Sequence, residues 1–419
     1  MKKVALTLAS VLAAAAFAPE ASAVPAFARQ TGMGCTACHT QHFPVLSGFG
    51  RAFKADGFTM MGSQEKIEGE HLSIPAVLNT GILLKAQYRK TNGTKKVYEN
   101  AAGDVITTND GAWLVPDEFG LFFAGRLADT GTLKVGTMIE HNMDDLVGFR
   151  IPVVTDVGAV KLSVIPFLTD ALSPFYGYTE SSTGLNRAIR WNEHHADISA
   201  HRFVGMATGA ASGIAFVAKT DMAYINFSRF TPNYPLAQQA MGSNLIHIGV
   251  TPNVAGFDMV LTAEFVSGKV KVQDALSVAN PTGTNTFIDG DATKSSGFSA
   301  QATGDLAGFE SSFYATYAVA PKSTASETNS YNGSLTDDTS AMTVGADVSV
   351  IPHVLHLAGA YRNGKAAGKT DNSVTVAATY DLAQNMALQV THSARSGSKY
   401  DTVQTNGTQQ TSILLETAW

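Results

Sequence analysis

The sequence of 419 residues predicts an all-β transmembrane barrel of roughly 16 antiparallel strands, preceded by a small α-helical domain. Three observations predict this fold class. From about Asn79 onward, apolar and polar side chains alternate with a period of two. Short and long polar connections alternate along the chain, as periplasmic turns and external loops do in outer-membrane barrels. Third, charged residues make up only 15% of the chain, a composition that favours the barrel. The net charge of −6 gives no indication of nucleic-acid binding.

The first 23 residues have the pattern of a secretory signal peptide. Lys2 and Lys3 form a basic start, an apolar run follows at 4–18, and small residues at 21–23 suit a cleavage site. Beyond this run, no apolar stretch reaches the ~20 residues that a membrane helix needs. We therefore expect a signal peptide at 1–23, a small domain at 24–78 and an outer-membrane barrel in contact with lipid at 79–419.

The predicted strands carry apolar side chains on one face and small or polar side chains on the other. In the first strand, Ile82 and Leu84 alternate with Lys85 and Gln87. A soluble sandwich also alternates, with its polar face outside. The segments here run about ten residues, as tilted membrane strands do, whereas soluble strands usually run five or six. Segment length therefore favours the membrane barrel.

The chain ends "TSILLETAW", which places Ile413, Leu415 and Trp419 on one face and Glu416 on the other. A terminal aromatic residue after alternating apolar positions resembles the C-terminal signal of outer-membrane barrel proteins. The alternative is a hydrophobic tail that closes an ordinary sheet.

The connections between strands fall into two classes. Short turns are predicted at 128–132, 155–158, 208–213, 252–256, 304–308, 351–353 and 381–384. Long polar connections are predicted at 91–117, 169–198, 231–242, 269–295, 320–339, 364–371 and 396–409. The connection 169–198 would be the third external loop, which folds into the lumen of many 16-stranded porins, an argument by analogy alone.

The segment 24–78 differs from the barrel. After Pro44, which suits a first helical turn, Leu46, Phe49 and Phe53 fall on one apolar face of a predicted short helix. Gly57 is placed to end that helix.

Both cysteines of the chain lie in "CTACH", which is Cys35, Cys38 and His39. In an exported chain this spacing predicts covalent attachment of one haem c, with His39 as a ligand of the haem iron. A zinc site would need further Cys or His ligands, and a thioredoxin-like disulfide would need a βαβ context. For the sixth iron ligand we favour Met60 or Met61, since Met opposite His raises the redox potential. The alternative for this Met pair is apolar packing beside the haem.

The stretch "AVPAFARQTGMGCTACH", residues 23–39, resembles the signature of the fused outer-membrane cytochrome–porins of iron-oxidising bacteria. Every fixed position of A-x-P-x-F-A-R-Q-T-G-x-x-C-x-x-C-H is met, whereas beyond His39 the resemblance concerns layout alone. It implies a monohaem domain that plugs a barrel of about 16 strands and oxidises extracellular Fe(II). Electrons would pass to a periplasmic carrier, such as a soluble cytochrome or a copper protein. Whether such a chain is counted as an iron:cytochrome oxidoreductase is left open.

Within this signature, we expect Phe27 to pack on the porphyrin and Arg29 or Arg51 to meet a haem propionate. The alternative for each arginine is a solvated surface charge. Two loops carry ligands that suit ferrous iron, "EHNMDD" at 140–145 and "WNEHHAD" at 191–197, although polar loops carry such residues by default.

Three other functions remain open on the sequence. One is a diffusive porin with an accessory haem domain. Another is an outer-membrane electron conduit of the same build for a different donor. The third is a soluble periplasmic cytochrome fused to a binding domain.

Overall fold

The computed structural model describes residues 25–40, 45–62, 64–94, 98–99, 105–107, 109–142, 146–181, 199–232, 240–274, 286–402 and 404–419. The N-terminal helices are α2 (Pro25–Thr31), η1 (Cys35–Ala37) and α3 (Gly48–Ala55), followed by the hairpin of β1 (Lys66–Gly69) and β2 (Leu72–Pro75). No helix among these residues is long and apolar enough to cross a membrane.

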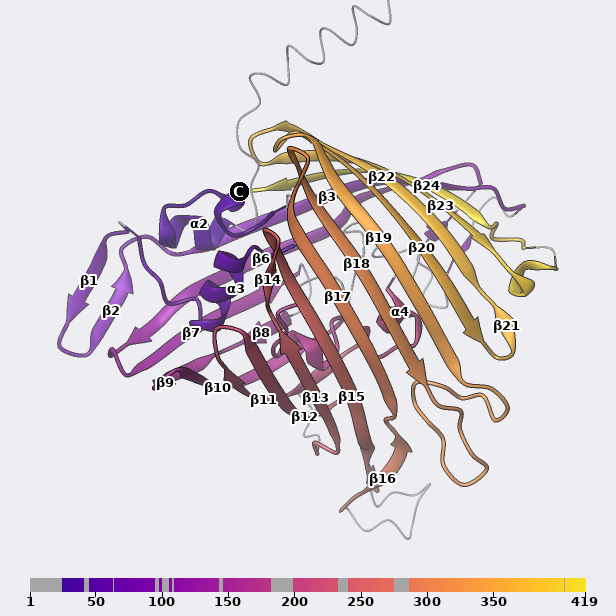
Figure 1. Ribbon diagram of the computed structural model, residues 1–419, viewed down its shortest axis with the longest axis horizontal. Coiled ribbons are helices and arrows are strands. Elements are labelled where there is room, and N and C mark those ends of the chain that lie inside the picture. Colours follow the sequence, from indigo (N-terminus) through magenta and orange to yellow (C-terminus); the bar gives the residue numbers. More distant parts are fainter. Residues whose placement is uncertain are drawn as a thin grey trace, which may run out of the picture.

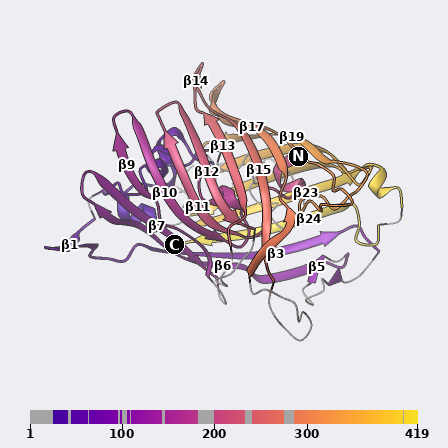
Figure 2. The ribbon, with the colours of Figure 1, turned by 90° about the horizontal axis from the view of Figure 1, so that it is seen from below.

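The rest of the described chain forms one closed antiparallel barrel (Figures 1 and 2). Its strands are β3 (Thr80–Thr91), β6 (Ala112–Asp129), β7 (Leu133–His141), β8 (Leu146–Arg150), β9 (Val153–Val157), β10 (Val160–Thr169), β11 (Ala211–Lys219), β12 (Ala223–Thr231), β13 (Ser243–Val250), β14 (Asn253–Val254), β15 (Phe257–Asp274), β16 (Thr286–Ala292), β17 (Ser295–Leu306), β18 (Phe309–Ala320), β19 (Thr339–Ile351), β20 (Leu355–Ala366), β21 (Lys369–Thr370), β22 (Asn372–Ala383), β23 (Met386–Ser396) and β24 (Gln409–Ala418). A separate small hairpin pairs β4 (Tyr98–Glu99) with β5 (Val105–Thr107).

The predicted strand number is confirmed. Four of these barrel segments, β9, β14, β16 and β21, continue β8, β13, β17 and β22 across short interruptions, so the described residues make 16 strands. The last strand closes the barrel against the first, with Leu414 opposite Gln87 and Ala418 opposite Leu83. Pairing on both sides leaves no open sheet edge in this ring, which is the condition for a sheet to enter lipid.

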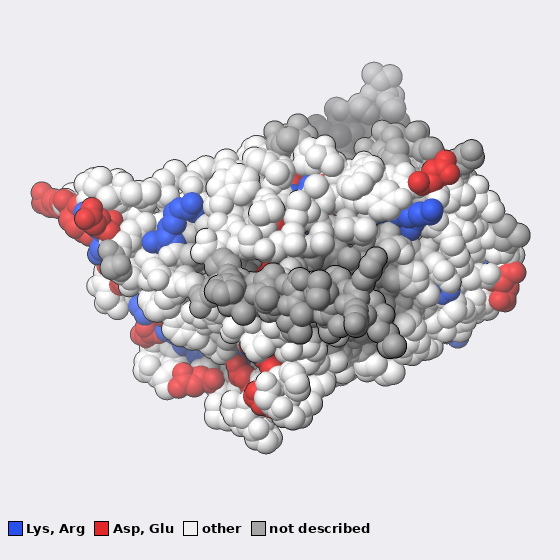
Figure 3. Space-filling view, turned by 90° about the horizontal axis from the view of Figure 1, so that it is seen from above, with Lys and Arg blue, Asp and Glu red and all other residues white. Residues whose placement is uncertain are grey.

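The two faces of the strands separate as the sequence predicts. Lys85, Gln87 and Arg89 point into the lumen and are buried, whereas Leu84 and Ile413 face outward and are 37% and 41% exposed. On the face shown in Figure 3, the visible charged side chains gather mainly toward the two ends. Apolar residues outside and polar residues inside are the pattern of a membrane barrel.

One end of the barrel carries the short turns, and we call it the short-turn end; the opposite end is the long-loop end. The short turns lie at 130–132, 158–159, 220–222, 255–256, 307–308, 352–354 and 384–385. Six of them match predicted turns. The predicted turn at 208–213 is wrong, because this stretch leads from a lumenal segment into β11, and the actual turn at 220–222 was missed. The predicted long connection 364–371 is wrong as well, because β20 and β21 pair across it with a turn at 367–368.

The predicted helix of the N-terminal segment forms as α3, with two differences. Ser47 accepts a hydrogen bond from the Gly50 amide and so starts the helix after Leu46, which is therefore not on its face. Phe49 is 42% exposed, whereas Phe53 is buried as predicted. Gly57 has a φ of 70° and ends the helix, which confirms that prediction.

Candidate functional site

Cys35, Cys38 and His39 lie on a single turn. The amides of Cys38 and His39 both donate to the Cys35 carbonyl, at 3.1 and 2.9 Å. Both thiols are free and half-buried. Burial, with a smaller contribution from Cys35, raises the pKa of the Cys38 thiol. Two free thiols and an imidazole on one turn are the donor set that covalent haem attachment requires, so these residues fit the group.

Helix α3 packs directly on this turn. The backbone of His39 forms a β-bridge with Leu46, and the Ser47 amide donates to the Cys38 carbonyl at 2.8 Å. A Cβ atom added at Gly50 would overlap the Cys38 carbonyl oxygen. Glycine at position 50 therefore permits the contact between α3 and the Cys-x-x-Cys-His turn.

Phe27 and Arg29, two residues of the signature on α2, take different positions. The Phe27 ring stacks on Phe58 with centroids 4.9 Å apart and meets the edge of Phe53 at 5.2 Å. Phe27 thus belongs to an aromatic cluster, and its contact with a porphyrin remains a prediction. Arg29 donates to the Thr80 carbonyl at the start of β3, so its side chain fastens α2 to the barrel wall.

Gln30 joins three parts of the structure, and the sequence analysis missed its role. Its side chain is fully buried, and its Nε2 donates to the carbonyls of Phe58 (2.6 Å) and Met60 (2.8 Å). Its Oε1 accepts from the Arg126 amide on β6 at 2.9 Å and lies 3.4 Å from Asn79 Nδ2. The segment that carries the predicted sixth ligands is thus held to α2 and to the wall.

The N-terminal segment 25–62, which we call the plug, touches the wall on several sides of the short-turn end. A Cβ atom at Gly136 of β7 would overlap the Gly57 carbonyl oxygen, so the backbones meet directly there. On another side, the Arg51 guanidinium lies 2.5 Å from Asp258 of β15. Contacts with β3, β6, β7, β10 and β15 place the plug in the mouth of the barrel, as the views of α2 and α3 in Figure 1 show.

Asp56 forms an ionic latch between the plug and the wall. Its carboxylate lies 2.7 Å from both Lys134 of β7 and Lys161 of β10, and Asp156 bridges the same two lysines at 3.4 and 2.8 Å. Partial burial by itself raises the pKa of Asp56, but hydrogen bonds from Lys134 and Lys161 outweigh it and hold the pKa below its usual range.

We expect the latch to fail in acid. Because the folded pKa of Asp56 is depressed, its contribution is complete above the ordinary pKa of about 3.9 and is lost as the pH falls through the lower, folded value. Asp56→Asn removes the charge at every pH and should weaken plug docking by roughly 1 kcal/mol, since the groups are partly exposed. Proteolysis of the plug in detergent-folded protein, measured against pH, checks this. Equal acid sensitivity in Asp56→Asn and the parent chain would contradict it.

Two cationic residues of α3 reach inward from the plug. Arg51 is buried, and its Nε lies 3.4 Å from Glu180 Oε2, so the alternative of a solvated surface charge is wrong for Arg51. Its contact with a haem propionate stays a prediction. Lys54 Nζ donates to the Thr179 carbonyl at 2.7 Å. Burial, reinforced by repulsion from Arg150, lowers the pKa of Lys54 to about 7. Lys54 can therefore exchange a proton near neutral pH.

The connection between β10 and β11 folds into the lumen. It contains η2 (Pro174–Tyr176) and α4 (Ala200–Phe203), and residues 173–181 are all buried. Phe175 and Met206 pack there with Phe230 and Leu245 of the wall, and none is more than 1% exposed. For its described part, the predicted insertion of this connection is confirmed. This apolar cluster inside the barrel argues against a wide aqueous channel along this side of the lumen.

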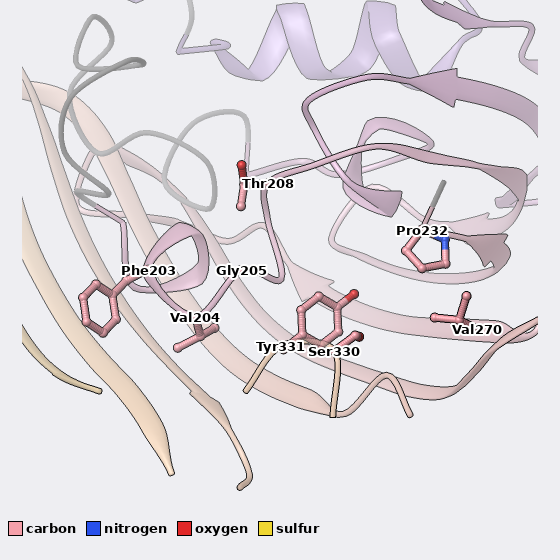
Figure 4. Close-up of a pocket in the computed structure, with 8 residues that line it drawn as sticks. All are labelled: Phe203, Val204, Gly205, Thr208, Pro232, Val270, Ser330 and Tyr331. Atoms are coloured by element: carbon pink, nitrogen blue, oxygen red, sulfur yellow. The ribbon is translucent and has the colours of Figure 1, made fainter. Parts of the chain in front are cut away.

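A cleft of ≈430 Å³ lies beyond α4 toward the long-loop end (Figure 4). Its lining is neutral and consists of Phe203, Val204, Gly205, Thr208, Pro232, Val270, Ser330 and Tyr331. The cleft is large enough for solvent and lies beside the end of α4.

The predicted iron-binding loops fall largely outside the described residues. Glu193, His194, His195, Asp197, Asp144 and Asp145 are not described. Glu140 and His141 end β7 near each other, but no group of three or more His, Cys, Asp and Glu side chains suited to a metal ion occurs in the described part of the chain.

The closed barrel with a lumenal loop and an N-terminal plug defines a porin-type fold. No protein-family model and no curated protein sequence matches the chain. Among solved structures, it is similar to OmpF of Salmonella typhi, solved in complex with daunomycin, at 12% identity and a TM-score of 0.50, over 85% of this chain and 100% of that one. Similarity extends to OmpT of Vibrio cholerae (11% identity, TM-score 0.49, 85% and 100% covered) and to the channel DcaP of Acinetobacter baumannii (12%, 0.48, 82% and 97%). At such identities the likeness to OmpF supports the fold alone.

Proposed function

We propose that this chain is an outer-membrane electron conduit that takes electrons from extracellular Fe(II) and passes them to a periplasmic carrier through one haem. Cys35 and Cys38 would hold the haem, and His39 would ligate its iron. The observation that carries the proposal is the position of the Cys-x-x-Cys-His turn in the mouth of a closed barrel. The hydrocarbon layer is about 30 Å thick, and a redox group in the mouth of the barrel would shorten the distance that an electron has to cross.

The side chains around the turn suit this role. Bound haem supplies a one-electron couple between its ferric and ferrous states. Phe27, Phe53 and Phe58 form an aromatic cluster that would give the haem an apolar neighbour. Apolar surroundings disfavour a change in the charge of the haem iron unless polar groups compensate it. Gln30 fixes the segment carrying Met60 and Met61, either of which we propose as the sixth ligand.

Absorption spectra of outer membranes test this proposal. Fe(II) added to membranes that contain the parent chain should reduce the haem, whereas Cys35→Ala and His39→Ala should lose covalent haem or its normal spectrum, with a decrease in Fe(II) oxidation of at least tenfold. Thr40→Ala, next to the ligand, serves as the matched control. Heat-modifiable migration in gels verifies that each variant still forms a barrel. Haem that Fe(II) does not reduce in the parent chain would contradict Fe(II) as donor.

A diffusive porin with an accessory haem domain is the second candidate, and the likeness to the fold of OmpF favours it. The two proposals differ in conductance across planar bilayers. A conduit whose mouth holds the plug and whose lumen holds residues 173–181 should conduct ions poorly. Large, steady conductance of the intact chain would favour the porin.

A further inference from the structure

Three titratable side chains meet inside the barrel, away from the haem site. Glu264 of β15 lies between two histidines, with Oε2 at 3.1 Å from Nε2 of His201 on α4 and Oε1 at 3.6 Å from Nε2 of His247 on β13. The Thr262 hydroxyl also donates to Glu264. All three titratable residues are 0% exposed. We call His201, His247 and Glu264 the lumenal acid–base cluster.

Folding alone gives little reason for this cluster. It lies within apolar packing, where Phe175 places its ring edge-to-face against both His201 and His247 at 6.4 and 5.5 Å. Buried charged groups are seldom more stabilising than apolar side chains of similar volume. In addition, His201 Nδ1 is buried without a hydrogen-bond partner among the described residues, a state that destabilises the fold. Such exceptions call for a functional explanation.

A series of contacts connects the cluster to the plug. His247 Nε2 lies 2.9 Å from the Tyr224 hydroxyl, which accepts a hydrogen bond from the Glu180 amide at 3.3 Å. The Glu180 carboxylate pairs with Arg51 of α3. Arg51 in turn donates to the Leu46 carbonyl at 3.2 Å, and Leu46 is the residue bridged to His39. The cluster is therefore connected to the Cys-x-x-Cys-His turn through a continuous series of side-chain and backbone contacts.

We propose that the lumen takes up one proton when the haem takes up one electron, and that the lumenal acid–base cluster is the proton acceptor. The inference rests on the proposed function and adds proton transfer to it. On reduction of the bound haem by external Fe(II), a nitrogen or carboxylate oxygen of the cluster would form a bond to a proton from water. On oxidation by the periplasmic carrier, that bond would break and the proton would return to water. The summed charge of the haem and the buried cluster would thus stay constant, which matters because buried charges interact more strongly than charges in water.

The cleft at the long-loop end is where the proton would enter. It is lined by Phe203, two residues after His201 on α4 (Figure 4). Other titratable or charged groups face the cluster or the contacts that lead to it: Lys54 and Arg51 from α3, Tyr178 and Glu180 from the lumenal connection, Lys219 from β11, Tyr224 from β12 and Asp258 from β15. Of these, Lys54 is the main competitor for the proton, since its pKa lies at about 7.

The haem midpoint potential, titrated from about pH 5 to about pH 8, tests the proposal. Because the reduced state binds the proton, the potential of the intact chain should fall as the pH rises, by up to about 59 mV for each tenfold change in proton concentration. Glu264→Gln should flatten this slope. His201→Asn provides a second variant in case Glu264→Gln does not fold, as judged by heat-modifiable migration. Glu416→Gln changes a buried lumenal carboxylate on the opposite wall beside Lys85 and should keep the slope.

Each of the following outcomes would overturn the inference. A pH-independent potential in the intact chain excludes proton coupling, and an unchanged slope in both Glu264→Gln and His201→Asn excludes this cluster. A slope that disappears in Lys54→Met but persists in Glu264→Gln assigns the proton to the plug instead. A chain without covalent haem refutes the proposed function and this inference together, whereas haem with a flat potential refutes only the inference.

Discussion

Gly136→Val is expected to release the plug while the barrel still forms. Any Cβ at this position would overlap the Gly57 carbonyl oxygen, so the plug has to move away from β7. Moving it also separates Asp56 from Lys134 and Lys161. We expect a loss of about 2–3 kcal/mol in docking free energy, in line with overpacked contacts. Limited proteolysis should then cleave the plug at least tenfold faster, and the haem of the proposed function should become accessible to aqueous reductants.

Gly359→Val is the matched control. Gly359 lies in β20, and a Cβ atom there would come no closer than 3.9 Å to another part of the chain. This variant should leave the rate of plug cleavage unchanged. If Gly136→Val and Gly359→Val are cleaved at the same rate as the parent chain, the direct backbone contact between plug and wall does not hold the plug.

Gln30→Leu is expected to destabilise the plug by roughly 3–5 kcal/mol. The substitution keeps the approximate size of the side chain but leaves the Arg126 amide and the carbonyls of Phe58 and Met60 without their buried partner. Each such loss costs about 1–3 kcal/mol. The measurement is the equilibrium accessibility of the plug to pulse proteolysis in denaturant.

The same variant reports on the sixth ligand. If Met60 or Met61 binds the haem iron, Gln30→Leu should weaken the methionine–iron absorption band, because Gln30 holds the carbonyl of Met60. Gln64→Leu is the control: Gln64 also bonds to Asn79 and Val77, but it is partly exposed and lies outside the joint between α2 and the wall. Equal effects of the two substitutions would contradict the special role of Gln30.

Much of the barrel was predictable because its physics is local. Alternation around Ile82 and Lys85 assigns the two faces of a strand from neighbours in sequence, and the turn at 304–308 is marked by Asp305 and Gly308, whose amide bonds to the Asp305 carboxylate. The stretch 208–213 has the same composition of small residues but serves another purpose, since Ala211 is fully buried beside the lumenal connection. Composition does not distinguish a turn from a tightly packed approach of two segments.

The same distinction between local and long-range contacts decides which parts of the site were predictable. Cys35, Cys38 and His39 are adjacent in sequence, so their meeting on one turn was predictable. Arg51 and Asp258 are 207 residues apart, and the pairing of His201 with Glu264 spans 63 residues. Such contacts depend on the register of the barrel and on the path of the lumenal connection, neither of which a local pattern specifies. The available sequence signal for the lumenal acid–base cluster was Glu264, a glutamate on the polar face of a predicted membrane strand.

The pairing of β24 with β3 also makes the seam of the barrel a contact between distant parts of the chain. The plug directly precedes β3, whereas β24 follows all the other barrel strands. Arg29 ties the plug to Thr80, the first residue of the closing strand. The plug is therefore fastened beside the seam, so that loosening the β24–β3 pairing would also loosen the attachment of α2 to the wall.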